Sequence, residues 1–280
     1  MTPEAPSPEA LSPEHMSPDL KKALRRYLLT VADDEIVIGY RDSEWTGVAP
    51  MVEEDLAFSS LAQDELGHAR LLYTLVGGLS GEDPDRLALQ RDKTGYYHAQ
   101  VLEMRTAPKY QPDGNHLADG DWTSAIVRRY LYDLFDDLRS ESLAASSYAP
   151  LAGAVRKVRR EERYHLKHGE TWWRTLAGNP ETRARLEAAV QSLWPGLLGL
   201  FEAPAGEGPL LEAGLLEASS DELLERWRAR LTPLFGAHGL TVPAGAEAQT
   251  GGRRGRHGPD WDELYEDMTM VVRLEPEGRW

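Results

Sequence analysis

Residues 151–176 read LAGAVRKVRREERYHLKHGETWWRTL, and the apolar residues of this stretch recur every three or four positions, as they do on one face of an α-helix. Glu162 and His165 fall on the same face and interrupt its apolar stripe. Their Glu-x-x-His spacing lets both side chains reach one point beside the helix. Because an unpartnered buried carboxylate would cost several kcal/mol, we expect a compensating cation at this point.

An earlier stretch of the chain repeats this arrangement. Glu65 and His68 form a second Glu-x-x-His motif, and apolar residues precede and follow it on the same stripe. One such pair arises easily by chance on a solvated helix face. Two pairs, each on an apolar stripe, favour a shared buried site.

A further helix, predicted over residues 18–41, offers Glu35. This residue lies between Val31 and Ile38 on the apolar stripe, where a hydrophobic side chain is expected. We therefore predict Glu35 as a third carboxylate ligand, with the neighbouring Asp34 as its alternative.

The helix predicted over residues 122–148 contains several acidic residues within two turns, and Asp133 and Asp137 are the two candidates. The interval from Asp133 to Glu162 is 29 residues, and the corresponding interval between the first two helices is 30. The two helix pairs are therefore near repeats of each other. This internal symmetry favours Asp133, and Asp137 remains the competing ligand.

A Glu from each of two helices, combined with Glu-x-x-His from each of two others, is the pattern of ferritin-like proteins that bind two iron or two manganese ions. The predicted ligands here are Glu35, Glu65, His68, Asp133, Glu162 and His165. Carboxylates with two imidazoles suit iron or manganese better than copper, so we predict two iron ions. The alternative is a metal-free network of salt bridges and hydrogen bonds between these residues and nearby arginines.

The rest of the chain predicts more helices and no strand. Helices are expected over 18–41, up to a stop at Gly77-Gly78, around 84–91 and 94–104, over 122–148 and 150–177, from Pro180, after Ser220, and over 259–272. Residues 79–120 are predicted to cross over the bundle. We therefore expect an all-α, ferritin-like four-helix bundle with additional C-terminal helices. Residues 17–280 would form one domain after a disordered Ser/Pro/Glu tail, residues 1–16.

The composition restricts the class of protein. No run approaches the roughly 18 apolar residues that a membrane span needs, and the N-terminus lacks the order of a secretory signal, so neither a membrane role nor export is expected. Without cysteine, any metal must be held by histidine and carboxylate groups. A formal net charge of -15 argues against nucleic acid as a main partner.

One basic cluster stands out in this acidic chain, at Gly251-Gly252-Arg253-Arg254-Gly255-Arg256. A glycine-rich backbone with Arg253, Arg254 and Arg256 could hold phosphate groups, such as those of a coenzyme A ester. The alternatives are a solvated loop or a contact with another subunit.

Several motifs together suggest a family. They are Glu44-Trp45 with Gly47 and Ala49-Pro50, Glu54-Asp55-Leu56-Ala57, Asp64 with Leu66-Gly67 and Ala69-Arg70, Arg163-Tyr164-His165-Leu166, Gly251-Gly252-Arg253-Arg254-Gly255 with His257, and Trp280. With these residues the chain resembles, over about residues 20–280, the C-type subunits of bacterial phenylacetyl-CoA epoxidases. The motifs are specific in combination, whereas each alone would be weak.

The resemblance implies a ferritin-like fold and a cytoplasmic complex that epoxidises the aromatic ring of phenylacetyl-CoA with O2. The implied partners are a reductase subunit that delivers electrons, a small bridging subunit, and the homologous A-type catalytic subunit. Association with a second copy of this chain, as a homodimer, stays open.

The resemblance also implies that the A-type subunit does the chemistry and that the C-type subunit is its structural partner, often with an incomplete ligand set. This sequence departs from that pattern because it keeps both Glu-x-x-His motifs. Three roles therefore remain: a partner subunit with its own di-iron site, a metal-free scaffold, and a stand-alone di-iron oxidase or hydroxylase.

Overall fold

The computed structural model describes residues 12–109, 120–276 and 278. Its α-helices are α1 (Pro18–Ser43), α2 (Val52–Ser80), α3 (Pro84–Leu89), α4 (Gln100–Glu103), α5 (Trp122–Ala144), α6 (Ala149–Ala177), α7 (Pro180–Leu198), α8 (Glu207–Glu212), α9 (Ser220–Gly236) and α10 (Trp261–Leu274). Single 3₁₀ turns lie at Pro13–His15, Lys93–Gly95, Gly199–Phe201 and Gly252–Arg254. No strand is present within the described ranges, so the predicted all-α class is confirmed.

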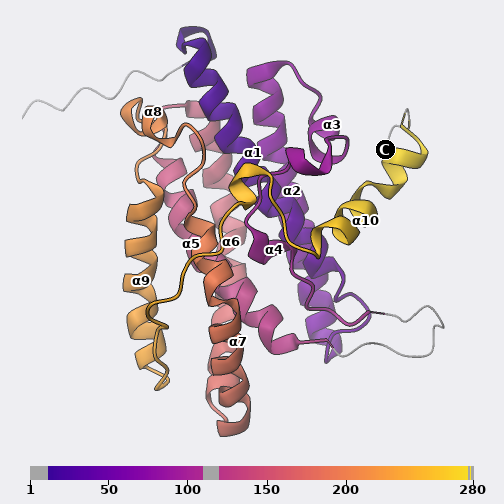
Figure 1. Ribbon diagram of the computed structural model, residues 1–280, viewed down its shortest axis with the longest axis vertical. Coiled ribbons are helices and arrows are strands. Elements are labelled where there is room, and N and C mark those ends of the chain that lie inside the picture. Colours follow the sequence, from indigo (N-terminus) through magenta and orange to yellow (C-terminus); the bar gives the residue numbers. More distant parts are fainter. Residues whose placement is uncertain (1–11, 110–119, 277, 279–280) are drawn as a thin grey trace, which may run out of the picture.

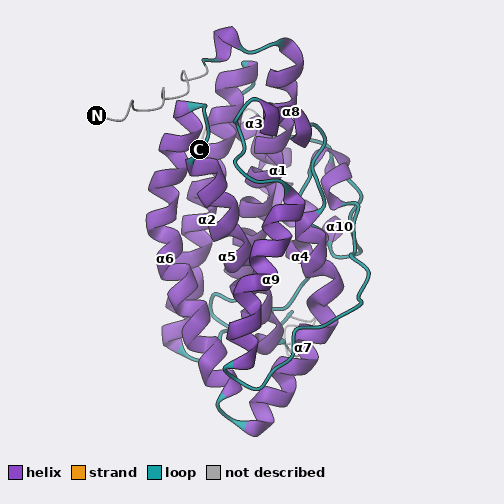
Figure 2. Cartoon of the chain, turned by 90° about the vertical axis from the view of Figure 1, so that its left-hand side faces the viewer, coloured by secondary structure: helices purple, strands orange, loops and turns teal. Residues whose placement is uncertain are grey.

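The bundle is built from two antiparallel helix pairs. In the first pair, Arg25 near the start of α1 forms an ion pair of 2.6 Å with Glu82, just beyond the end of α2. In the second pair, Tyr130 early in α5 packs against Gly169 late in α6. α2 and α6 also touch, less extensively than the members of each pair. Figures 1 and 2 show these long helices running side by side along the long axis of the molecule, the arrangement of a ferritin-like bundle.

Two glycines allow the helices of each pair to approach closely beside the predicted ligands. A Cβ atom on Gly39 would lie 3.0 Å from the Cβ of Glu65, and one on Gly169 would lie 2.5 Å from the ring of Tyr130. Both glycines lie one helical turn beyond a predicted ligand. The close packing of both pairs therefore requires glycine at these two positions.

The C-terminal third of the chain covers the bundle. α7 and α9 pack against α5, and the buried Trp227 of α9 donates a hydrogen bond of 3.0 Å to the carbonyl of Leu131. α10 lies beside α3, where Trp261 donates to the carbonyl of Lys93. None of the helices in the described part of the chain has the length and apolar character to cross a membrane.

Two helix ends differ from the prediction. α2 continues through Gly77-Gly78 and ends at Ser80, because Gly81, with φ of 77°, is the residue that adopts the left-handed cap. α5 ends at Ala144 rather than at residue 148. The amides of Ala145 and Ser146 donate to carbonyls three residues earlier, and the amide of Ser147 then donates to the carbonyl of Gly214 in a distant segment.

The helix predicted around 94–104 is reduced to the single turn of α4, because carboxylates of α1 bind the amides that a longer helix would use. Asp33 accepts from the amide of Tyr97, and Asp34 accepts from the amide of Ala99. Most of the predicted tail, residues 1–11, and Trp280 lie outside the described residues. In the remainder of the predicted tail, Pro13–His15 form a 3₁₀ turn and Met16 is buried.

Candidate metal centre

The six predicted ligands lie together in the interior, where α1, α2, α5 and α6 meet, and all six are buried. They form two groups of four donor atoms, each group within 4.8 Å of one another. The first group, which we name the His68 position, comprises Glu35, Glu65, His68 and Glu162. The second, the His165 position, comprises Glu65, Asp133, Glu162 and His165. Glu65 and Glu162 belong to both groups.

The donor atoms of the His68 position face one another without hydrogen-bond partners. His68 Nδ1 lies 3.2 Å from Glu162 Oε1, 3.7 Å from Glu65 Oε2 and 3.9 Å from Glu35 Oε2. Among the described residues, none of these four buried atoms has a hydrogen-bond partner. Atoms that share an ion at about 2.1 Å lie roughly 3 to 4 Å apart. The His68 position therefore fits one metal ion.

The opposite atoms of these ligands are held in place from outside the group. Glu35 Oε1 accepts from Arg139 Nη2 at 2.9 Å and from the Tyr132 hydroxyl at 3.0 Å. His68 Nε2 donates to Glu161 Oε2 at 2.9 Å. Outer hydrogen bonds of this kind orient metal ligands and fix the tautomer of a coordinating imidazole. Glu35 Oε2 and His68 Nδ1, which lie 3.9 Å apart, therefore stay free of hydrogen bonds within the donor group.

Without a metal ion, protons on Glu35 and His68 reduce the negative charge of the buried carboxylates. Burial, and then the neighbouring Glu65 carboxylate, raise the pKa of Glu35 well above its ordinary value. Burial alone would lower the pKa of His68, but the nearby carboxylates of Glu162, Glu35 and Glu65 outweigh that effect and raise the pKa. His68 must therefore lose a proton before Nδ1 can coordinate a cation.

The His165 position has a different occupant, the guanidinium of Arg129. Its Nη2 hydrogen-bonds to Glu65 Oε1 and lies 2.7 Å from His165 Nδ1, while its Nε lies 2.9 Å from Asp133 Oδ1. Because a guanidinium can only donate, this contact is a hydrogen bond when His165 Nδ1 is unprotonated and the ring proton lies on Nε2, facing Asp64 at 3.2 Å. The His165 position therefore does not fit a second metal ion beside Arg129.

The two alternative ligands weighed from the sequence lie elsewhere. Asp34 binds Arg253 at 2.6 Å and Arg139 at 2.5 Å, and it belongs to neither donor group. Asp137 forms ion pairs near the surface, including one of 2.5 Å with Arg230. The structure thus brings Glu35 and Asp133 into the site. Whether these ligands bind metal remains a prediction.

The basic cluster divides into buried and exposed residues. Arg253 is buried and bonds to Asp34 and to the carbonyl of Leu200, so its guanidinium fastens the C-terminal segment to α1. Arg254 and Arg256 are exposed, and Arg254 lies 3.2 Å from Glu202. A contact with a phosphate group or another subunit remains a prediction for these two residues.

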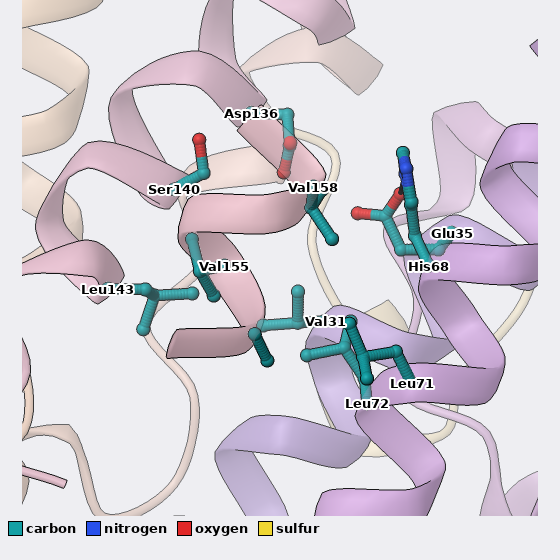
Figure 3. A pocket seen from close by; sticks show the side chains of 11 residues that line it. Val31, Glu35, His68, Leu71, Leu72, Asp136, Ser140, Leu143, Val155 and Val158 are labelled. Carbon is teal, nitrogen blue, oxygen red and sulfur yellow. Dashed lines mark ion pairs between the residues drawn. The ribbon is translucent and has the colours of Figure 1, made fainter. Parts of the chain in front are cut away.

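An apolar cavity lies directly beside the His68 position. In Figure 3, Val31, Leu72 and Val155 face one another across it, and Glu35 and His68 lie at its edge. Its volume is about 20 Å³, which is close to the minimum for one water molecule. The site is therefore walled by apolar side chains that exclude most water.

A groove between α2 and α6 reaches the side chain of His68 from the surface. The residues that line it include Gly67, His68, Lys157 and Glu161. Glu161 is half-exposed, so the hydrogen bond between Glu161 and His68 joins the groove to the buried site.

Sequence reasoning missed Arg129 and Arg139, the two cations that bind the ligands. A signal was present for each, because both lie on α5 within one turn of a buried acid, Arg129 four residues before Asp133 and Arg139 three residues after Asp136. Their targets on α1, α2 and α6 depend on how the helices face one another, which the local spacing does not determine.

The fold and the donor groups define a ferritin-like helical bundle with a carboxylate–histidine site at its centre. The family model described as "Phenylacetic acid catabolic protein" matches residues 9–280, so the chain belongs to that family.

Two curated proteins of Escherichia coli (strain K12), both components of its 1,2-phenylacetyl-CoA epoxidase, are similar to the chain. The C component of that epoxidase is 29% identical over 259 residues, covering 92% of this chain and 99% of that protein. The A component is 26% identical over 228 residues, covering 80% of this chain and 69% of that protein. The predicted resemblance is confirmed.

Proposed function

We propose that the chain is the C-type subunit of a multicomponent oxygenase that epoxidises the aromatic ring of phenylacetyl-CoA in phenylacetate catabolism. The observation that carries this proposal is the match to almost the whole length of the E. coli C component, whereas the A component is covered over only 69% of its length. The proposed partners are a reductase, a small bridging subunit, and the homologous A-type catalytic subunit. A cytoplasmic location belongs to the same proposal.

In this proposal the ring is oxidised on the A-type subunit. One atom of O2 enters the ring as the epoxide oxygen and the other leaves as water, with two electrons from the reductase and two protons. This chain supports that reaction by packing against its homologue. The buried charge network of α1, α2, α5 and α6 would keep the bundle rigid in such a complex.

Iron is the metal we propose for the His68 position. Glu35, Glu65 and Glu162 would hold it through oxygen atoms and His68 through Nδ1, a donor set that suits iron or manganese. Bound iron would supply redox chemistry. The chain's own residues orient the ligands through Arg139, Tyr132 and Glu161, and the apolar wall of the neighbouring cavity limits the access of water.

Reconstitution tests the role of this chain in the complex. The A-type, small and reductase subunits are combined with and without this chain, and phenylacetyl-CoA-dependent O2 consumption and epoxide formation are measured. We expect a stable complex with the A-type subunit on size-exclusion chromatography, and activity that requires this chain. Unchanged activity without it would refute the proposal, and full turnover by this chain with the reductase alone would establish the stand-alone oxidase instead.

A further inference from the structure

We propose that Arg129 takes the place of the second metal ion, so that this chain binds one metal ion, at the His68 position, instead of two. The inference concerns the residues of this chain alone and does not depend on the proposed oxygenase partners. It rests on the different surroundings of the donor atoms in the two halves of the site.

In the His68 position, the four inward-facing atoms are all available. Glu35 Oε2, Glu65 Oε2, His68 Nδ1 and Glu162 Oε1 have no hydrogen-bond partner within the described part of the chain. All four are buried, and leaving buried polar atoms without partners is unfavourable. A single cation placed between them would satisfy all four at once.

In the His165 position, Arg129 lies among the donor atoms and hydrogen-bonds to two of them, while Asp133 meets it only as an ion pair and has no hydrogen-bond partner among the described residues. The Nη2 group contacts both Glu65 Oε1 and His165 Nδ1, and Nε contacts Asp133 Oδ1. A metal ion on His165 Nδ1 would need the same in-plane lone pair that now accepts from Nη2. The guanidinium and a second ion therefore exclude each other.

Arg129 is held too firmly to move aside. Its side chain is 1% exposed, and Nη1 forms a further bond of 3.0 Å to Asp42 on α1. The guanidinium thus joins α5 to α1, α2 and α6 through one partner on each of these three helices. Displacing it would leave a charged group unpaired in the interior, which is strongly unfavourable.

Such a replacement is chemically consistent. A guanidinium supplies a permanent positive charge and several N–H donors in a plane, so it can bind bridging carboxylates and an imidazole together. It cannot change its oxidation state or bind O2. The chain would therefore keep the charge balance of a two-ion site and lack a pair of ions that could share a bound O2.

The experiment is an anaerobic titration of the full-length chain with Fe(II) and with Mn(II), with the bound metal counted after desalting. We expect about one ion per wild-type chain, and about two in Arg129→Ala, where Glu65, Asp133 and His165 become free. The matched control is Arg128→Ala. Arg128 is equally buried and pairs with Asp42, but it does not contact the donor group, so this variant should still bind one ion.

The electron paramagnetic resonance spectrum of the Mn(II)-loaded wild type provides a test that does not depend on the folding of any variant. A single uncoupled Mn(II) signal supports the inference. Two ions per wild-type chain, or a spin-coupled Mn(II) pair, would overturn it. So would a wild type that binds no metal, or a folded Arg129→Ala that still binds one ion.

Discussion

Within the described residues, histidine and carboxylate side chains gather in two buried places, the candidate metal centre and a second group formed by His98, Glu103 and His257, which we name the Glu103 cluster. In the Glu103 cluster the donor atoms face one another as hydrogen-bond partners. Glu103 Oε2 accepts from His98 Nε2 at 2.6 Å and lies 3.2 Å from His257 Nδ1, and Glu103 Oε1 accepts from the amide of Gly258. In the His68 position, by contrast, the four donor atoms lie close together and none of them has a hydrogen-bond partner among the described residues.

Ring geometry separates the two groups further. The imidazoles of His98 and His257 are stacked, with centroids 4.2 Å apart and planes inclined by 14°. The lone pair of an imidazole nitrogen lies in the ring plane, so two stacked rings cannot both direct their lone pairs at one ion about 2.1 Å away. The Glu103 cluster is therefore a hydrogen-bonded anchor for the C-terminal segment, although its residue types are those of a metal site.

The comparison shows that residue type and proximity do not identify a metal site. What distinguishes the His68 position is that four donor atoms converge without partners while their opposite atoms are held from outside. Four predictions test this distinction.

The largest effect is expected for Glu103→Ala. This change leaves His98 and the amide of Gly258 buried without their acceptor, and breaking a buried charged network in this way costs about 3–5 kcal/mol. Urea unfolding should show a loss of this size, and the loss should be equal in metal-free and metal-loaded protein. A loss confined to the metal-loaded protein would make the Glu103 cluster a metal site after all.

Acid should weaken the Glu103 cluster. Burial alone would raise the pKa of Glu103, but hydrogen bonds from His257 and His98 outweigh it and lower the pKa to about 2, from an ordinary value of 4.5. Because the folded pKa is depressed, the stabilisation of about 3 kcal/mol is present above pH 4.5 and is lost as the pH falls towards 2. Burial also lowers the pKa of His98, so protonation of this ring in acid favours the unfolded chain and lowers stability as well.

The measurement is urea unfolding of wild type and Glu103→Gln across this pH range. The variant lacks the titrating carboxyl, so its difference in unfolding free energy from the wild type should narrow as the pH falls from 5 to 3. If the difference in unfolding free energy stayed constant across this pH range, the charge of Glu103 would contribute nothing to stability.

At the metal centre, His68→Ala should abolish stabilisation by metal. A ligand that binds only the folded chain adds about 2.7 kcal/mol at a free concentration of 100 times its Kd. We expect this increase in wild type and in Glu103→Ala, and its absence in His68→Ala, as measured by urea unfolding with and without Mn(II). Equal stabilisation of His68→Ala would show that the metal binds elsewhere.

The ligand-bearing helices were predictable because the 3.6-residue period decides both the helix and the face on which a polar residue lies. Glu65 and His68 interrupt an apolar stripe, and this interruption is visible in the sequence alone. The stop at Gly77-Gly78 was wrong because a local rule for glycine cannot tell a helix interior from its cap. The residue in the left-handed conformation is Gly81.

What could not be predicted depends on partners far away in the sequence. Arg129 is marked as buried by its apolar neighbours, but its contact with His165 depends on the rotation of α5 against α6. Residues 96–99 carry no sign that Asp33 and Asp34 would bind their amides and prevent a helix. Such outcomes require the packed helices, because each involves groups more than thirty residues apart.

The smallest predicted effect compares the two outer partners of the imidazoles. Glu161 binds His68 Nε2 at 2.9 Å, and Asp64 occupies the same place on the other half, 3.2 Å from His165 Nε2. Loss of such an outer hydrogen bond weakens metal binding by about 10-fold or more. If Arg129 fills the His165 position, Glu161→Gln should lower Mn(II) affinity by about 10-fold, while Asp64→Asn should leave it unchanged. Equal losses in the two variants would mean that both imidazoles coordinate metal, because only a coordinated ring transmits the change in its outer partner to the ion.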